Sequence, residues 1–221
     1  MIPDLTPIFS QYEALRDQVD GACAKVRSAE AEHVACHEGC SDCCYALFDL
    51  SLVEAMYINH AFMAAFGYGR ERSDILTRAS EIDRRLARFK RNLFREEKSG
   101  VDFESLLREA AQTRMRCPLL SDDNLCVLYA ARPITCRVYG IPTSIGGRGH
   151  VCGFSHFTKG GQYPTLKLDR VQLALARLSR AIGPAVGSRF DKLHDVYMPL
   201  SMALLTKFDN QFLGIGPAPR D

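Results

Sequence analysis

Hydrophobic positions recur along most of this chain at the three- and four-residue steps of an amphipathic helix. Ser51 and Glu54 form a capping-box pattern ahead of an apolar run that stops at Gly67, which indicates where one helix begins and ends. The expected helices cover residues 15–33, 51–67, 75–93, 103–115, 169–182 and 190–208. The chain is therefore expected to be mainly helical.

Short stretches with another pattern predict a small β element. Two apolar pieces, residues 117–120 and 125–129, flank Ser-Asp-Asp-Asn, whose side chains favour a turn, so we expect a hairpin there. Residues 140–153 are expected to form a loop, and residues 163–169 one strand. This strand content is too low for a parallel-sheet enzyme fold. The predicted class is mainly α with a small β element (α+β).

The length of the chain predicts a single domain. With 221 residues, of which 47% are hydrophobic and 24% charged, the chain can bury one substantial core. Within the domain 1–221 we expect an N-terminal helix in residues 1–35, a cysteine-rich core in 36–152 and C-terminal helices in 165–213. The result would be a helical fold arranged around the cysteine-rich core.

Charge and segment composition argue against several classes of partner. The net charge of +2 is too balanced to indicate nucleic acid or an anionic membrane. The first residues lack the basic and apolar regions of a signal peptide, and no stretch approaches the roughly 18 apolar residues of a membrane span. We therefore expect a cytoplasmic protein with no nucleic-acid or membrane partner; a protein partner stays unknown.

The chain contains nine cysteines, and eight of them fall in two regions. In a thiol-reducing compartment such a set indicates metal ligation or redox chemistry rather than disulfides. Cys23 stands apart on the first helical stripe and is expected to be a packing residue. The candidate metal ligands are Cys36, Cys40, Cys43, Cys44, Cys117, Cys126, Cys136 and Cys152.

The spacing of these cysteines favours an iron–sulfur cluster over zinc, and both stay open. Thiolates around a cluster need not come as paired hooks, and adjacent cysteines such as Cys43 and Cys44 fit around a cluster more easily than around one ion. Structural zinc typically takes two C-x2-4-C hooks. Cys40 and Cys43 form one such hook, whereas eight, nine and fifteen residues separate the four later cysteines.

Arginine and histidine side chains near the cysteines are candidates for supporting roles. Arg132 and Arg137 flank Cys136 and could supply the positive charge that stabilises thiolates. Four histidines lie near the cysteines in sequence, and an orienting or surface role is expected for them more than ligation: His33, His37, His150 and His156. No nucleophile motif is present, so we assign no catalytic residue and leave open whether the protein is an enzyme.

The cysteine pattern resembles that of the YkgJ-type cysteine-cluster family, a zinc- or iron-chelating domain. The residues that carry the resemblance are C36-x3-C40-x2-C43-C44, C117-P-L-L, C126-V-L-Y-A-A-R-P-I-T-C136-R and Cys152. The first spacing is three residues rather than the commoner two. The resemblance covers residues 36–152 and implies a metal or iron–sulfur centre held by the eight cysteines, with a redox, sensing or structural role.

The same resemblance leaves two further functions open. A similar cysteine domain occurs in the larger flagellin lysine N-methylases, which implies methyl transfer at an iron–sulfur centre as an alternative. The second alternative is a structural zinc fold that serves as an interaction module. The spacing of Cys36, Cys40 and Cys43 also matches that of radical S-adenosylmethionine enzymes, but a helix precedes it and Asp42 occupies the usual aromatic position.

Overall fold

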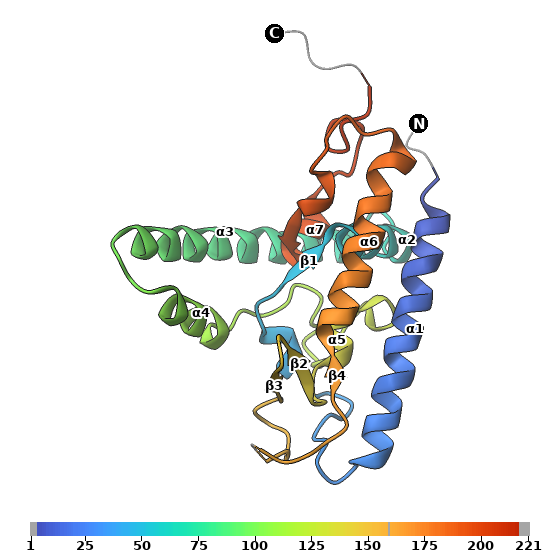
Figure 1. Ribbon diagram of the computed structural model, residues 1–221. Coiled ribbons are helices and arrows are strands. Elements are labelled where there is room, and N and C mark those ends of the chain that lie inside the picture. The colour runs from blue at the N-terminus through green and yellow to red at the C-terminus, as the bar shows by residue number, and fades with distance from the viewer. Residues whose placement is uncertain (1–3, 159, 217–221) are drawn as a thin grey trace.

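The computed structural model describes residues 4–158 and 160–216, which form mainly helices (Figure 1). The α-helices are α1 (Thr6–Ala29), α2 (Leu52–Ala65), α3 (Arg70–Lys98), α4 (Phe103–Gln112), α5 (Ile134–Val138), α6 (Leu168–Val186) and α7 (Leu200–Leu205). Three 3-10 helices join them: η1 (Asp42–Tyr45), η2 (Tyr129–Ala131) and η3 (Leu193–Asp195). The short strands are β1 (Asp49–Ser51), β2 (Thr143–Ile145), β3 (Arg148–His150), β4 (Leu166–Lys167) and β5 (Tyr197–Pro199). The predicted class, mainly α with a small β element, is confirmed.

The strands form two small sheets. Strands β1 and β5 pair antiparallel, with Leu50 opposite Met198, and both side chains are buried. The second sheet has the order β3-β2-β4, in which β2 pairs antiparallel with β3 and parallel with β4. The first sheet therefore ties the start of α2 to the start of α7 across about two thirds of the chain.

The core lies where α1, α2, α6 and α7 meet. Helices α1 and α6 run side by side, α2 packs against both of them, and α7 packs on α2 (Figure 1). Tyr12, Phe62 and Ile182 come from three of these helices and are almost fully buried in one cluster. Cys23 lies in the same cluster with no exposed surface, as expected of a packing residue.

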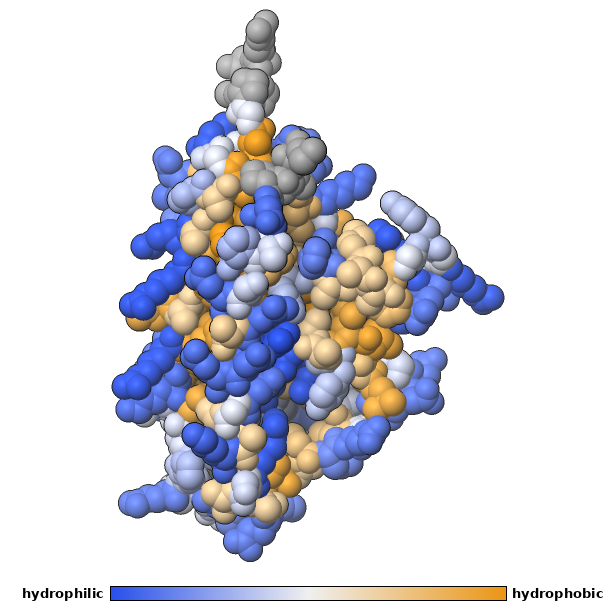
Figure 2. Space-filling model, turned by 90° about the vertical axis from the view of Figure 1, so that its right-hand side faces the viewer, coloured by the Kyte–Doolittle hydropathy of each residue, from blue (hydrophilic) through white to orange (hydrophobic). Residues whose placement is uncertain are grey.

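Helices α3 and α4 form an arm that projects from this body (Figure 1). The first part of α3 packs on α7 through the buried Ile75 and Ala79, whereas the far end carries exposed apolar side chains such as Phe94. Charged residues cover the outer face of α3. Figure 2 views the face that carries α1. Hydrophilic residues cover most of the left of this view, and hydrophobic residues gather to the right of its centre.

The predicted capping box is present, and it does more than begin α2. Ser51 donates to Glu54 Oε2 from its backbone N–H at 3.2 Å and from its hydroxyl at 2.8 Å. Glu54 Oε1 accepts a third hydrogen bond, of 3.1 Å, from the backbone N–H of Ile134. This buried carboxyl therefore joins the start of α2 to the start of α5.

Several predicted elements differ in the structure. The run 190–208 is not one helix, because Pro199 lacks an N–H, and the chain instead forms η3, β5 and the short α7. The hairpin predicted over 117–129 is reduced to an isolated bridge between Leu120 and Cys126. The loop 140–153 contains the β2–β3 hairpin, whose turn has Gly146 and Gly147 at positive φ.

The first helix is also displaced along the chain relative to the prediction. It begins at Thr6, with a proline in its first turn, and ends at Ala29, before His33. The predicted strand 163–169 shrinks to Leu166 and Lys167, after which α6 begins. Within the described ranges, no helix is long and apolar enough to cross a membrane.

Candidate metal centre

The first cysteine region follows α1 as an irregular segment that ends in η1. Gly39 takes a φ of +83°, and the N–H of Cys40 donates to the carbonyl of His37 at 3.1 Å, so the chain turns tightly there. The N–H of Cys44 donates to the carbonyl of Ser41 at 2.9 Å, which closes η1. This turn places the adjacent Cys43 and Cys44 in one 3-10 helix.

Backbone hydrogen bonds join the second cysteine region to the first. The N–H of Cys117 donates to the carbonyl of Cys44 at 2.6 Å, and the N–H of Met115 donates to the carbonyl of Tyr45 at 3.0 Å. From Cys117 the chain turns at 121–125 and returns, with the N–H of Val127 bonded to the carbonyl of Leu119 at 2.9 Å. Cys126 therefore lies on the returning limb of a turn that begins beside η1.

Cys136 lies on α5, and Cys152 follows β3. Helix α5 begins after Pro133, and its first N–H is held by Glu54. The Cys152 thiol lies 3.6 Å from Asp42 Oδ2 and donates to it. The loop after β3 therefore returns to η1, the same element that carries Cys43 and Cys44.

Cys36 is held by a close approach to the end of α5. Its thiol lies 3.7 Å from the carbonyl oxygen of Tyr139 and packs directly against Gly140. Gly140 has a φ of +92°, and a Cβ at this position would overlap the Cys36 sulfur. Only glycine satisfies both the backbone conformation and the space that the thiol needs.

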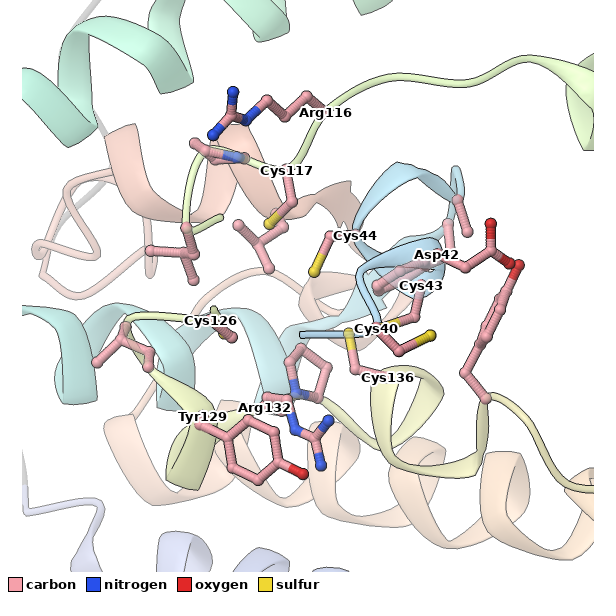
Figure 3. Close-up of a pocket in the computed structure, with 18 of the residues that line it drawn as sticks. Cys40, Asp42, Cys43, Cys44, Arg116, Cys117, Cys126, Tyr129, Arg132 and Cys136 are labelled. Atoms are coloured by element: carbon pink, nitrogen blue, oxygen red, sulfur yellow. The ribbon is translucent and has the colours of Figure 1, made fainter. Parts of the chain in front are cut away.

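One cavity of about 690 Å³ is lined by all eight predicted ligand cysteines. Cys44 and Cys117 lie next to each other, and Cys40, Cys43 and Cys136 lie together farther along the cavity (Figure 3). Cys23, in the helical core, does not line it. All nine cysteines are free, and the two cysteine regions, which are far apart in sequence, share one site.

Burial governs the acidity of most of these thiols. Although solvent reaches into the cavity, the surrounding protein raises the pKa of Cys117 to about 12 and that of Cys36 to about 11, because it disfavours the thiolate. Burial also raises the pKa of Cys136 well above its usual range. These thiols therefore need a cation close by to become thiolates.

Cys43 differs from its neighbours. A hydrogen bond from Cys44 lowers the pKa of the Cys43 thiol to about 7 and raises the pKa of Cys44. The positive charge of Arg132 also lowers the pKa of Cys43. Cys43 is therefore the thiol of this pair that loses its proton first.

The two arginines expected to stabilise thiolates have different roles. Arg132 lines the cavity, and its guanidinium carbon lies 3.6 Å from the centroid of the Tyr129 ring. Within the described part of the chain, the buried Nε of Arg132 has no hydrogen-bond partner. Arg137 instead donates to the carbonyls of Arg132 and Ala130 and pairs with Asp20 of α1, so it holds α5 to α1. Arg137 was expected to supply positive charge to the thiols, but it does not line the cavity.

Three further polar residues line or border this cavity and were not predicted from the sequence as site residues. Asp42 pairs with Arg114, which approaches from the segment after α4. Tyr139 lies nearby, and burial together with the Asp42 carboxyl raises its pKa to about 12. Asp42 and Arg114 are 72 positions apart, so no local pattern could have indicated the pair.

The histidines are less involved than the cysteines. Only His37 of the four lines the cavity, and its Nδ1 lies 2.9 Å from the carbonyl of Ala35. His33 stacks on Phe157 and contacts Tyr163, with ring centroids 5.4 and 5.1 Å apart. His150 and His156 are exposed outside the cavity lining.

As placed, the side chains do not close around a single point. Among residues 4–158 and 160–216, no three His, Cys, Asp or Glu side chains are arranged to hold a metal ion. The thiols instead border a space larger than one ion. Their chemistry suits a soft metal or a cluster, since thiolates are the ligands that zinc and iron–sulfur clusters take.

Comparisons with known proteins add no relative. No family model matches the chain, and neither a curated protein nor a solved structure is significantly similar to it. The resemblance to the YkgJ-type family therefore depends on the cysteine pattern alone and stays a prediction.

Proposed function

We propose that this protein binds a metal centre, an iron–sulfur cluster in preference to zinc, through its clustered cysteines. The observation that supports this proposal is the single cavity lined by all eight thiols from five separate segments. A cytosol-like reducing compartment suits nine free cysteines, so we also propose a cytoplasmic location.

The inner part of the cavity offers the strongest ligand set. Electrostatic influence links Cys44 to Cys117 and Cys126, and links Cys136 to Cys117, Cys43 and Cys126, so these five thiols are close neighbours. Cys36 is influenced most by Cys40 and Cys152 and less by Cys43. We therefore propose that Cys43, Cys44, Cys117, Cys126 and Cys136 supply the principal ligands, that Cys40 lies beside Cys43 and Cys136, and that Cys36 and Cys152 lie at the outer side.

The preference for a cluster over one zinc ion follows from how the thiols are spread. A zinc ion requires four ligands at about 2.0–2.3 Å from one point, whereas the corners of a cluster accept thiolates spread over a larger space. A bound cluster would supply one-electron redox chemistry or a sensing function. The chain's own residues would orient the thiols, and Arg132 would balance their negative charge.

Metal analysis of anaerobically purified protein tests this proposal. The expected result is iron and acid-labile sulfide in similar amounts, with visible absorption that bleaches on reduction. Zinc without visible absorption would assign a structural zinc site instead. If protein whose cysteines are still reduced contains neither iron nor zinc in a stoichiometric amount, the proposal is contradicted.

A further inference from the structure

The cavity extends well beyond the thiols. Residues of α3 and α7, which carry no cysteine, form part of its wall: Ile82 and Leu86 from α3, and Leu200 from α7. Phe48 before β1 and Ile58 of α2 continue this wall. A site that held only a metal would need no such apolar extension.

The extension is lined by buried and half-buried side chains. Ile58 and Leu119 are each 1% exposed and Leu86 is 6% exposed, so the wall belongs to the packed interior. Arg78 of α3 donates to the carbonyl of Pro118 at 3.3 Å, which holds α3 over the cavity. The wall is therefore formed where α2, α3 and α7 lie beside the segments that carry Phe48 and Leu119.

Charged groups gather at the thiol end of the cavity, and several of them have partners within the protein. Asp42 pairs with Arg114, Arg27 donates to the carbonyl of Arg137, and Arg116 donates to the carbonyls of Leu120 and Ser121. At the apolar end, Ser201 turns its hydroxyl to Asp83. The side chains that line this end carry no charge: Phe48, Ile58, Ile82, Leu86, Leu200 and Ser201. A charged group buried there would therefore lack a charged partner in the lining, at a cost of several kcal/mol.

From this lining we propose that the apolar end of the cavity binds a neutral, hydrophobic small molecule next to the thiols. The whole cavity, thiol end included, measures about 690 Å³, which lies within the roughly 300–1,000 Å³ of small-molecule sites, and the lining of its apolar end is of the mostly apolar kind that such sites have. A ligand seated there would be placed between α3 and the cysteines. It would give the centre a substrate or effector site, and the binding itself does not require that the metal be present.

A neutral dye tests this site directly. The fluorescence of N-phenyl-1-naphthylamine rises in apolar surroundings, and its binding to the full chain should saturate at one molecule per chain and be reversed by 1-decanol. Ile82→Trp, which fills the apolar end, should weaken dye binding by roughly tenfold or more, since lost space removes most of the contact. Asn92→Trp, at an exposed position of the same helix, is the matched control and should bind as the parent does.

Three measurements keep the result decisive. They are dye binding, metal content and helical circular dichroism. Both variants should keep the metal content and the circular dichroism of the parent protein. If the parent itself contains no metal, that result contradicts the proposed metal centre and leaves the test of the dye site unaffected. If Ile82→Trp fails to fold, Ile82→Ala should still bind the dye and should shift the preference from 1-decanol toward longer alcohols. Dye binding that is absent, or equal in Ile82→Trp and Asn92→Trp, would overturn the inference.

Discussion

The backbone N–H of Cys117 donates a 2.6 Å hydrogen bond to the carbonyl oxygen of Cys44, across 73 positions of sequence. This bond makes the two cysteine regions neighbours through the main chain, independently of any metal. The thiols of both regions therefore line one cavity before any metal binds. A centre bound there would find its ligands partly assembled, which reduces the ordering entropy of binding.

Replacing individual cysteines should separate ligands from the packing residue. Cys117→Ala is expected to lose most of the bound metal, because Cys117 lies within the inner group of thiols. Cys23→Ala should retain the metal and destabilise the fold by about 1 kcal/mol, since it removes one small buried side chain. Metal content and chemical denaturation measure the two effects. Loss of metal from Cys23→Ala would force a different ligand set.

Gly140→Ala should disturb the Cys36 thiol specifically. The substitution strains a backbone at φ +92° and places a methyl group on the Cys36 sulfur, so we expect a loss of about 2–3 kcal/mol of unfolding free energy. Gly100→Ala is the matched control, because Gly100 has a φ of +97° but open space around it, and it should cost only about 1 kcal/mol. Denaturant titration compares the two.

A second substitution identifies the cause of the Gly140→Ala effect. Cys36→Gly in the Gly140→Ala background removes the sulfur that the methyl group would meet. We expect it to recover the difference between Gly140→Ala and Gly100→Ala. Equal stability of the double and single variants would show that the thiol is not the obstacle.

Arg132→Gln should weaken metal retention without unfolding the protein. Arg132 lines the cavity with the thiols, and its positive charge lowers the pKa of Cys43 and opposes the rise in pKa that burial causes at Cys126 and Cys136. Removing a charge beside the ligands typically costs about 10–100-fold in metal affinity. Competition with a chelator measures this, and Arg108→Gln on the exposed face of α4 is the control. An unchanged competition curve would remove Arg132 from the centre.

Chelation should loosen part of the chain and spare the rest. The segment 117–153 is mostly irregular and borders the cavity, whereas α1, α2 and α6 share an apolar core of their own. We expect helical circular dichroism to persist after chelation and new proteolytic cleavage to appear within 121–153. Near-complete loss of the helical signal would mean instead that the centre holds the whole fold together.

Glu54→Gln should destabilise the junction of α2 and α5. The two carboxyl oxygens accept three hydrogen bonds, and an amide would turn its NH2 toward one of the donors. We expect a loss of about 1–3 kcal/mol in unfolding free energy, the usual cost of a buried unpaired group. Glu104→Gln, at an exposed position of α4, should change stability by less than about 0.5 kcal/mol.

The pH dependence of stability gives Glu54 a second test. Burial raises the pKa of this carboxyl above its ordinary 4.5, so the folded state keeps the proton to a higher pH than the unfolded state does. The stability associated with the protonated form is therefore present below pH 4.5 and is lost as the pH rises through the raised value. Denaturation of Glu54→Gln should lack this decline, and identical pH profiles for the two proteins would contradict the assignment.

The helical class, the start of α2 and the eight cysteines that line the cavity could all be predicted from the sequence. Helical periodicity and the capping box of Ser51 and Glu54 act over a few residues, so they can be recognised without knowing what the helix packs against. Cys23 could be separated from the other cysteines for the same reason, because it lies on the buried stripe of one helix. The spacing of the other thiols indicated metal chemistry but not which thiols are neighbours.

Other features of the fold and of the site depend on tertiary contacts. The run 190–208 has helical spacing, yet the pairing of β5 with β1 and the missing N–H of Pro199 divide it into three elements. Arg132 and Arg137 look equivalent beside Cys136, yet Asp20 on α1 holds Arg137 away while Arg132 lines the cavity. These outcomes depend on contacts between residues many tens of positions apart, and such contacts are set by how whole helices pack rather than by the local preferences that a sequence pattern records.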